Sequence, residues 1–151
     1  MKIIVDTNIV FSVLLNTRSI LGDLLLNTKH LFSFYSCYLL REEIQRHSER
    51  LLKLSGMTRT QLEDAQFHVY SAIRFVSEEQ FPYSIWQTAI PLVRDVDMDD
   101  VAFVALTEYL QGTLWTGDRT LTDGLKAKGY SKFLTTKELM NIRREEEDKR
   151  K

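Results

Sequence analysis

Four acidic side chains carry the chemistry that this sequence suggests. They lie far apart in the chain, at the ends of predicted strands or in the helices beside them: Asp6, Glu43, Asp100 and Asp118. Carboxylates gathered in one pocket repel one another, and their pKa values rise if no positive charge lies between them. A hard divalent cation removes this conflict, and Mg²⁺ or Mn²⁺ suits carboxylates and water better than zinc does. Such an ion binds phosphate oxygens and activates water for in-line attack.

Asp6 directly follows the apolar, β-branched run Ile3–Val5, which is typical of a strand buried inside a parallel sheet. Open α/β sheets place their ligands at the carboxyl ends of such strands. Asp118 follows a second predicted strand, Thr113–Thr116, so parallel central strands would bring both carboxylates to one edge. A structural interpretation stands beside the functional one, because Asp6 or Asn8 could simply cap the next helix.

Asp100 closes the acidic stretch Asp95–Asp100 and precedes the apolar run Val101–Leu106. We expect it in the first turn of a helix, where the helix dipole favours the ionised carboxylate. Acidic runs are usually solvated loops or helix caps, and Asp97 and Asp99 are expected to include some of that kind. The stretch therefore predicts Asp100 as one acid of the site, and it leaves open whether Asp97 or Asp99 also belongs to the site.

The elements that position these acids alternate along the chain. Predicted strands cover residues 2–5, 31–35, 73–76, 113–116 and 133–134. Predicted helices cover residues 9–15, 19–26, 38–54, 58–72, 83–93, 101–111 and 121–128, and a final helix begins after Thr135. Capping boxes at Thr58 with Gln61 and at Thr135 with Glu138 mark two helix starts, and Gly56 ends a helix. Strands separated by helices predict an α/β fold, a three-layer α/β/α sandwich around a central parallel sheet of roughly five strands.

Length and composition favour one domain over residues 1–151, with residues 139–151 as a terminal helix that frays into a charged tail. A formal net charge of −1 argues against nonspecific coating of duplexes, but not against a local basic site. The single Cys37 excludes an internal disulfide and suits a reducing compartment. No apolar run approaches the ~20 residues that span a bilayer, and no signal peptide precedes the first strand. We therefore expect a cytoplasmic protein without a membrane partner.

Four short motifs, in this order, resemble a PIN domain: Ile-Val-Asp-Thr-Asn, Leu-Leu-Arg-Glu-Glu-Ile, Asp-Met-Asp-Asp followed by Phe-Val-Ala-Leu, and Leu-Trp-Thr-Gly-Asp. The likeness is greatest to the VapC-like ribonucleases that act as toxins in bacterial toxin–antitoxin pairs. It extends over most of the chain, roughly from Met1 to Leu139. Each motif is short and weak by itself, and the specificity comes from their order and spacing.

The resemblance assigns the first acid of the family to Asp6, with Asn8 as the polar residue just after it. The second acid falls on Glu43, because the family has an aliphatic residue next, here Ile44. Glu42 is the alternative register.

The third family acid falls on Asp100, five residues before Ala105. Asp99 or, last in rank, Asp97 could contribute instead. The fourth falls on Asp118, with Thr116 as a nearby hydroxyl. Many relatives have a further acid two residues later, where this chain has Thr120, so firm binding of a second metal is in doubt.

By resemblance, the protein is a Mg²⁺- or Mn²⁺-dependent ribonuclease, often dimeric, with an RNA substrate and an antitoxin partner. Asp6, Asp100 and Asp118 would hold the metal directly or through water, and Glu43 would ligate it or orient the attacking water. Independently of the resemblance, Arg119 is expected to contact phosphate near the acids. The alternative from another class is a PIN-fold module that binds RNA or protein without cleaving.

Three other α/β families are disfavoured by what the sequence lacks. A receiver domain needs a phosphoacceptor aspartate after a middle strand and a late lysine. A haloacid-dehalogenase phosphatase needs Asp-x-Asp where this chain has Asp6-Thr7-Asn8. A nucleotide-binding fold needs a glycine-rich turn after the first strand.

Overall fold

A computed structural model describes the chain over residues 1–151. Five strands form one sheet in the order β3-β2-β1-β4-β5, and every neighbouring pair is parallel. The strands are β1 (Lys2–Val5), β2 (Ser33–Cys37), β3 (Arg74–Val76), β4 (Thr113–Trp115) and β5 (Phe133–Leu134). The predicted α/β class and the five parallel strands are confirmed.

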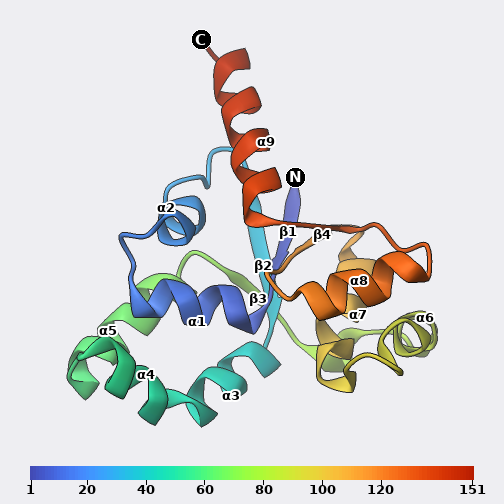
Figure 1. Cartoon of the computed structure of the whole chain (residues 1–151), viewed down its shortest axis with the longest axis horizontal. Helices are drawn as coiled ribbons and strands as arrows, with labels where there is room; N and C mark the ends of the chain where they lie inside the picture. The colour runs from blue at the N-terminus through green and yellow to red at the C-terminus, as the bar shows by residue number, and fades with distance from the viewer.

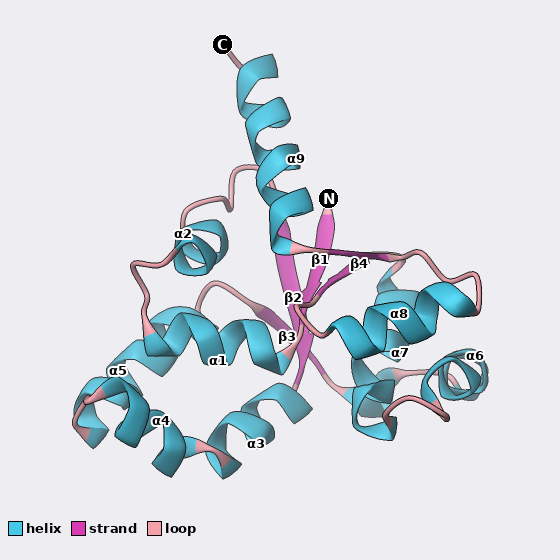
Figure 2. Ribbon diagram, viewed as in Figure 1, coloured by secondary structure: helices cyan, strands magenta, loops and turns pink.

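Helices cover both faces of this sheet (Figures 1 and 2). One side carries α1 (Thr7–Leu15), α2 (Ile20–Leu26), α3 (Leu39–Arg46), α4 (Ser48–Ser55) and α5 (Arg59–Tyr70). The other side carries α6 (Tyr83–Val93), α7 (Val101–Leu110) and α8 (Arg119–Ala127), and α7 packs on β1, β2 and β4. Two short 3₁₀ turns, η1 (Glu78–Gln80) and η2 (Met98–Asp100), lie between these elements. The last helix, α9 (Thr136–Lys149), extends away from the sheet toward the C-terminus.

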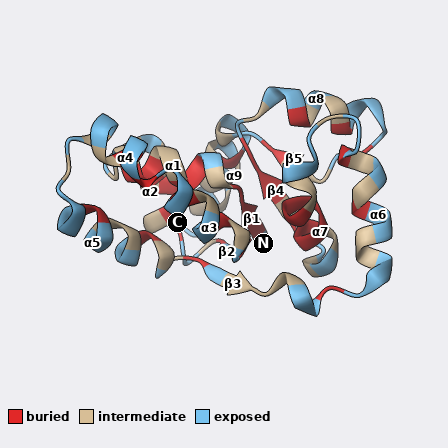
Figure 3. Ribbon diagram, turned by 90° about the horizontal axis from the view of Figure 1, so that it is seen from below, coloured by how far each residue is buried: buried red, intermediate tan, exposed pale blue.

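The hydrophobic core lies between the sheet and the helices that flank it (Figure 3). Ile3, Ile4 and Val5 are fully buried, as expected of a strand with neighbours on both sides and helices on both faces. Trp115 and Cys37 are also fully buried. The central strand that ends at the first acid is therefore held rigidly on all sides.

Helix starts and ends follow local chemistry. Both predicted capping boxes are present, at Thr58 with Gln61 and at Thr135 with Glu138. Gly56 follows α4 in the left-handed region, with φ 72°, which a residue without a Cβ adopts at little cost.

Several predicted boundaries were wrong. The single helix predicted over residues 38–54 is two helices, α3 and α4, which meet at His47, whose backbone (φ −102°, ψ 15°) leaves helical geometry. The strand predicted at 31–35 begins at Ser33, because the amides of Leu31 and Phe32 turn back to the Thr28 carbonyl. The helix predicted from residue 121 begins two residues earlier, at Arg119.

No single helix is long and apolar enough to cross a membrane. Helices α1 and α2 reach that length and apolarity only when counted together, and they meet at an angle of 111°.

Candidate active site

Asp6 directly follows β1, and its side chain caps the N-terminus of α1. Its Oδ1 accepts the Ile9 amide at 3.0 Å, and the Thr116 hydroxyl hydrogen-bonds the same carboxylate. The residue is only 4% exposed. The capping interpretation is thus correct, and it is compatible with a functional role, since the capped carboxylate also lines a pocket.

Asp118 has the same relation to the end of β4. Its Oδ1 accepts the Leu121 amide at 3.1 Å and caps α8. Its own backbone N–H donates to Thr116 Oγ1, also at 3.1 Å. The buried Thr116 hydroxyl therefore contacts both Asp6 and Asp118, and it fixes the two strand ends relative to each other.

Glu43 reaches the same region from α3. Thr7 Oγ1 donates a hydrogen bond of 2.7 Å to Glu43 Oε1. Glu43 is half-buried and lines the pocket, whereas Glu42 is exposed and lines no pocket. Of the two registers, the fold brings only Glu43 to the other acids.

The acidic loop supplies three carboxylates. Asp97 Oδ1 accepts the Asp99 amide at 2.9 Å, which folds the loop into η2. Asp100 then precedes α7 without a side-chain capping bond, and its Oδ2 is buried with no hydrogen-bond partner. A buried oxygen without a donor is costly, so this atom marks a place where a ligand would be stabilising.

These residues enclose one small pocket of about 140 Å³. Six carboxylates line it: Asp6, Glu43, Asp97, Asp99, Asp100 and Asp118. Thr7, Asn8 and Phe103 complete the lining. The four acids predicted from the sequence are thus brought together, and so is Asp97, which was ranked last. We call this hollow the acid pocket. Arg119 lies outside it, exposed at the start of α8.

Two of the acids have raised pKa values. Burial is the main cause of the rise of the Asp6 pKa to about 6, hydrogen bonds from Thr116 and Ile9 oppose it, and the charges of Asp118 and Glu43 add to it. Burial also raises the pKa of Asp100 to about 7, with further contributions from neighbouring carboxylates, Asp97 first. The helix dipole favours the ionised form of Asp100, but desolvation and like charges outweigh it, as expected of carboxylates gathered without a positive charge among them.

The donor set fits a hard cation. The side chains that line the acid pocket offer oxygen ligands and no His nitrogen or Cys sulfur. An added positive charge would reduce the repulsion among the carboxylates and would give the buried Asp100 Oδ2 a partner. No three of the chain's His, Cys, Asp or Glu side chains are arranged to hold a metal directly. The fit is thus to Mg²⁺ or Mn²⁺ that keeps several waters, rather than to an all-protein cage.

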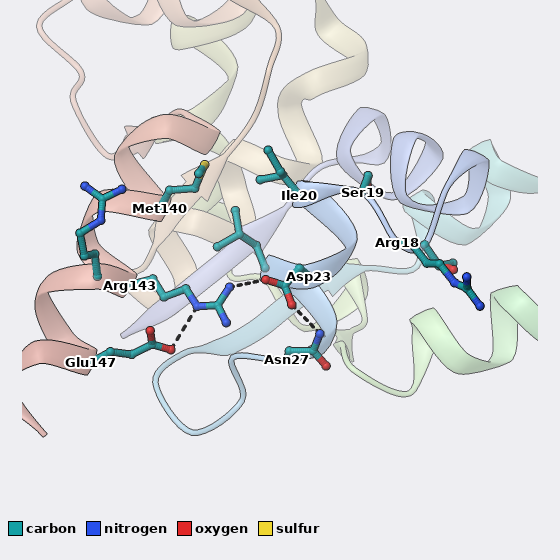
Figure 4. A pocket seen from close by; sticks show the side chains of 11 residues that line it. Arg18, Ser19, Ile20, Asp23, Asn27, Met140, Arg143 and Glu147 are labelled. Atoms are coloured by element: carbon teal, nitrogen blue, oxygen red, sulfur yellow. Dashed lines mark hydrogen bonds and ion pairs between the residues drawn. The ribbon is translucent and has the colours of Figure 1, made fainter. Parts of the chain in front are cut away.

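Four larger hollows lie outside the acid pocket, and two of them exceed the others in volume. One, of about 580 Å³, adjoins the acid pocket and shares Thr7, Asn8 and Glu43 with it. The other, of about 650 Å³, lies between α2 and α9 (Figure 4). There Arg143 of α9 pairs with Asp23 of α2 at 2.6 Å and with Glu147 of α9 at 3.1 Å. Both carboxylates are therefore already paired, and the Arg143–Asp23 pair holds α9 against α2.

Sequence reasoning missed Thr7 as a partner of Glu43. The only signal was its place directly after Asp6, which does not reveal the direction of its hydroxyl. His30, His47 and His68 are exposed. Burial raises the pKa of Cys37 to about 12, which makes this thiol a poor nucleophile.

Comparison with known proteins agrees with this geometry. The family model described as "PIN domain" matches residues 4–145. Among solved structures, the chain is similar to one chain of the "Crystal structure of VapBC2 from Rickettsia felis bound to a DNA fragment from their promoter". The TM-score is 0.64 at 12% sequence identity, over 89% of this chain and 97% of that chain. No curated protein matches the chain in sequence.

Proposed function

The chain belongs to the PIN domain family, and from this premise we propose that it is a divalent-metal-dependent endoribonuclease that hydrolyses phosphodiester bonds in RNA. One observation carries the proposal. Six carboxylates surround a pocket of about 140 Å³, and one of their buried oxygens, Asp100 Oδ2, has no partner. Such a cluster is unfavourable without a cation, and a cation among carboxylates binds phosphate.

In this proposal Asp6, Asp100 and Asp118 would hold Mg²⁺ or Mn²⁺ directly or through water, with Asp99 in support. The bound ion would supply positive charge against the phosphate oxygens and lower the pKa of a water molecule. The Thr116 hydroxyl keeps Asp6 and Asp118 in place through its contacts with both. The chain itself contributes no His or Lys nucleophile to this pocket.

Glu43 is the residue that would orient the attacking water. Its Oε1 is occupied by the Thr7 hydroxyl, so Oε2 can accept a hydrogen bond from water. Asn8, exposed at the wall of the acid pocket, would position the phosphate. Attack by the water forms one P–O bond and breaks another. The attacking water gives up a proton to solvent, and the leaving oxygen takes a proton from solvent. Arg119, exposed at the start of α8, remains a proposed phosphate contact at the periphery.

We further propose that the protein is the toxin of a toxin–antitoxin pair. The fold similarity to a chain of VapBC2, a complex bound to promoter DNA, supports this. A protein partner of the antitoxin kind, a homodimer and a cytoplasmic location belong to the same proposal. A small neighbouring gene for a DNA-binding protein would support the pairing.

The deciding experiment is cleavage of mixed single-stranded RNAs by purified protein with Mn²⁺, with Mg²⁺ and with EDTA. Asp6→Asn removes a site charge and keeps a capping oxygen, and the exposed Asp64→Asn is the matched control. We expect cleavage by wild type and Asp64→Asn with either metal, and none with EDTA or from Asp6→Asn. Equal cleavage by wild type and Asp6→Asn would point to a contaminant and refute the catalytic proposal.

The rival function is a PIN-fold module that binds RNA or protein without cleaving. It draws on one observation, that no three acids are arranged to hold a metal directly. RNA binding without metal-dependent cleavage, by protein that also gains no thermal stability from Mn²⁺, would favour this rival.

A further inference from the structure

The hollow of about 580 Å³ lies against the acid pocket and shares three wall residues with it, Thr7, Asn8 and Glu43. Its lining also includes Phe11 of α1 and Arg50 of α4. We call it the α1–α4 cleft. Because the two hollows meet at these shared residues, a polymer with one phosphate at the acids can place a neighbouring unit in the cleft.

The cleft contains a ready stacking surface. The Arg50 guanidinium carbon lies 5.2 Å from the centroid of the Phe11 ring, which is a cation–π arrangement. The His47 ring meets Phe11 edge-on, with centroids 6.4 Å apart and an interplanar angle of 87°. Arg50 and His47 are exposed, and Phe11 is only half-buried. The group therefore presents a planar cation on an aromatic ring to whatever enters the cleft.

Arg50 has no acidic partner. Its side chain forms no ion pair and no hydrogen bond within the chain, although nearby Arg59 pairs with Glu49 at 2.6 Å. A guanidinium offers five N–H donors in a plane, and these match phosphate and base edges. Next to a pocket with six carboxylates, a free cation is the group that would attract the phosphate of an approaching nucleic acid.

We propose that the α1–α4 cleft binds one nucleotide of single-stranded RNA beside the scissile phosphate, with its base stacked on the Arg50–Phe11 pair and its phosphate on Arg50. This inference rests on the proposed ribonuclease function, and it names the substrate as single-stranded. Bases of a duplex are already stacked and unavailable, whereas unpaired bases stack on aromatic rings and guanidinium planes. The cleft volume also lies in the range of about 300–1,000 Å³ typical of small-ligand sites.

The test measures binding rather than cleavage. All variants are made in an Asp6→Asn background, and a short fluorescent single-stranded RNA is titrated by anisotropy at several salt concentrations. Arg50→Ala is expected to raise Kd about tenfold and to lower the salt slope by about 0.7, the loss of one phosphate contact on a single strand. Arg46→Ala is the matched control, since Arg46 is exposed, four residues earlier in the chain and outside both hollows. It should change neither quantity.

Two further variants separate charge from stacking. Arg50→Lys keeps the positive charge but lacks the planar guanidinium group. The salt slope should therefore return to the value of the Arg50 protein, while Kd stays several-fold raised. Phe11→Leu keeps an apolar side chain and should raise Kd several-fold without any change of slope. Replacement of the nucleotide beside the cut by an abasic unit should weaken binding to the Asp6→Asn protein, with little further loss in Phe11→Leu.

Several outcomes would overturn the inference. The first is an unchanged Kd for Arg50→Ala, and the second is an equal loss of affinity in Arg46→Ala. The third is a loss of affinity from the abasic unit that is as large in Phe11→Leu as in the Asp6→Asn protein. They are distinct from failure of the proposed function, which the metal-dependent cleavage by wild type decides. If wild type cleaves RNA and the cleft variants bind it normally, only the cleft assignment fails.

Discussion

The Thr7 hydroxyl donates a 2.7 Å hydrogen bond to the Glu43 carboxylate, across 36 residues of sequence. The bond joins the first turn of α1 to α3, and it sits one residue after Asp6, the first acid of the pocket. A short hydrogen bond to a carboxylate fixes the direction of its second oxygen. Glu43 is thereby held in one orientation at the acid pocket before any substrate arrives.

Thr7→Val should therefore impair catalysis more than binding. The change keeps the size and β-branching of the side chain but removes the donor to Glu43. We expect kcat for RNA cleavage to fall about 10- to 100-fold, the usual cost of losing a supporting contact, with little change in KM. Thr7→Ser restores the hydroxyl and should recover most of kcat. A Thr7→Ser enzyme as slow as Thr7→Val would contradict the role of this bond.

Replacements of Asp118 should separate its structural from its chemical role. Asp118→Ala removes the cap of α8 and should lower the free energy of unfolding by about 1 kcal/mol. Asp118→Asn keeps a capping oxygen and should unfold nearly like wild type in urea. Both variants should lose RNA cleavage. An Asp118→Asn enzyme that retains activity would remove this residue from the metal site.

Stability of the metal-free protein should fall as pH rises. Asp6 and Asp100 have folded-state pKa values of about 6 and about 7, above the ordinary value of 3.8. Between about pH 4 and pH 7 the folded state thus binds more protons than the unfolded state, and the free energy of unfolding decreases. The loss over this whole window is on the order of 3 kcal/mol for the buried Asp6, and of similar size for Asp100 after allowance for its partial exposure. Urea unfolding in EDTA at pH 5 and pH 8 captures the part of the loss above pH 5, on the order of 1–3 kcal/mol for each group.

The double variant Asp6→Asn with Asp100→Asn supplies the control for this pH effect. It has neither titrating group, so its stability should change less between pH 5 and pH 8 than that of wild type. The same pH dependence in both proteins would mean that other groups cause it.

Mn²⁺ should stabilise the folded protein through the acid pocket. At a concentration of about 100 times Kd, a ligand adds about 2.7 kcal/mol, which corresponds to a Tm rise of roughly 5–10 °C for a chain of this size. Thermal unfolding of wild type and Asp64→Asn should show the rise. Asp100→Asn should show little of it. An equal rise in Asp100→Asn would place the ion elsewhere.

The sequence predicts the positions of Asp6 and Asp118 well, for a physical reason. An apolar run that ends in a carboxylate is readable as a buried strand and its end, and parallel strands then bring their ends together. Glu43 required the family resemblance, because a carboxylate within an amphipathic helix has no such local mark. The fold class followed from the alternation of strands and helices alone.

What the sequence could not supply depends on side-chain direction and on packing. The apolar spacing continues from Leu40 through Leu51, so it does not reveal the break at His47 that turns α4 and brings Arg50 over Phe11. The raised pKa of Asp100 likewise depends on burial and on carboxylates far away in the chain. These are properties of the assembled fold rather than of any local window.

The place of β1 in the sheet has a consequence for the protein's synthesis. The strand made first is the middle one, and its partner β4 is made only after most of the chain. A growing chain therefore carries Asp6 long before Asp118 exists to face it, and the acid pocket cannot close until synthesis has passed Asp118. A chain that stops before Asp118 should accordingly lack the proposed activity.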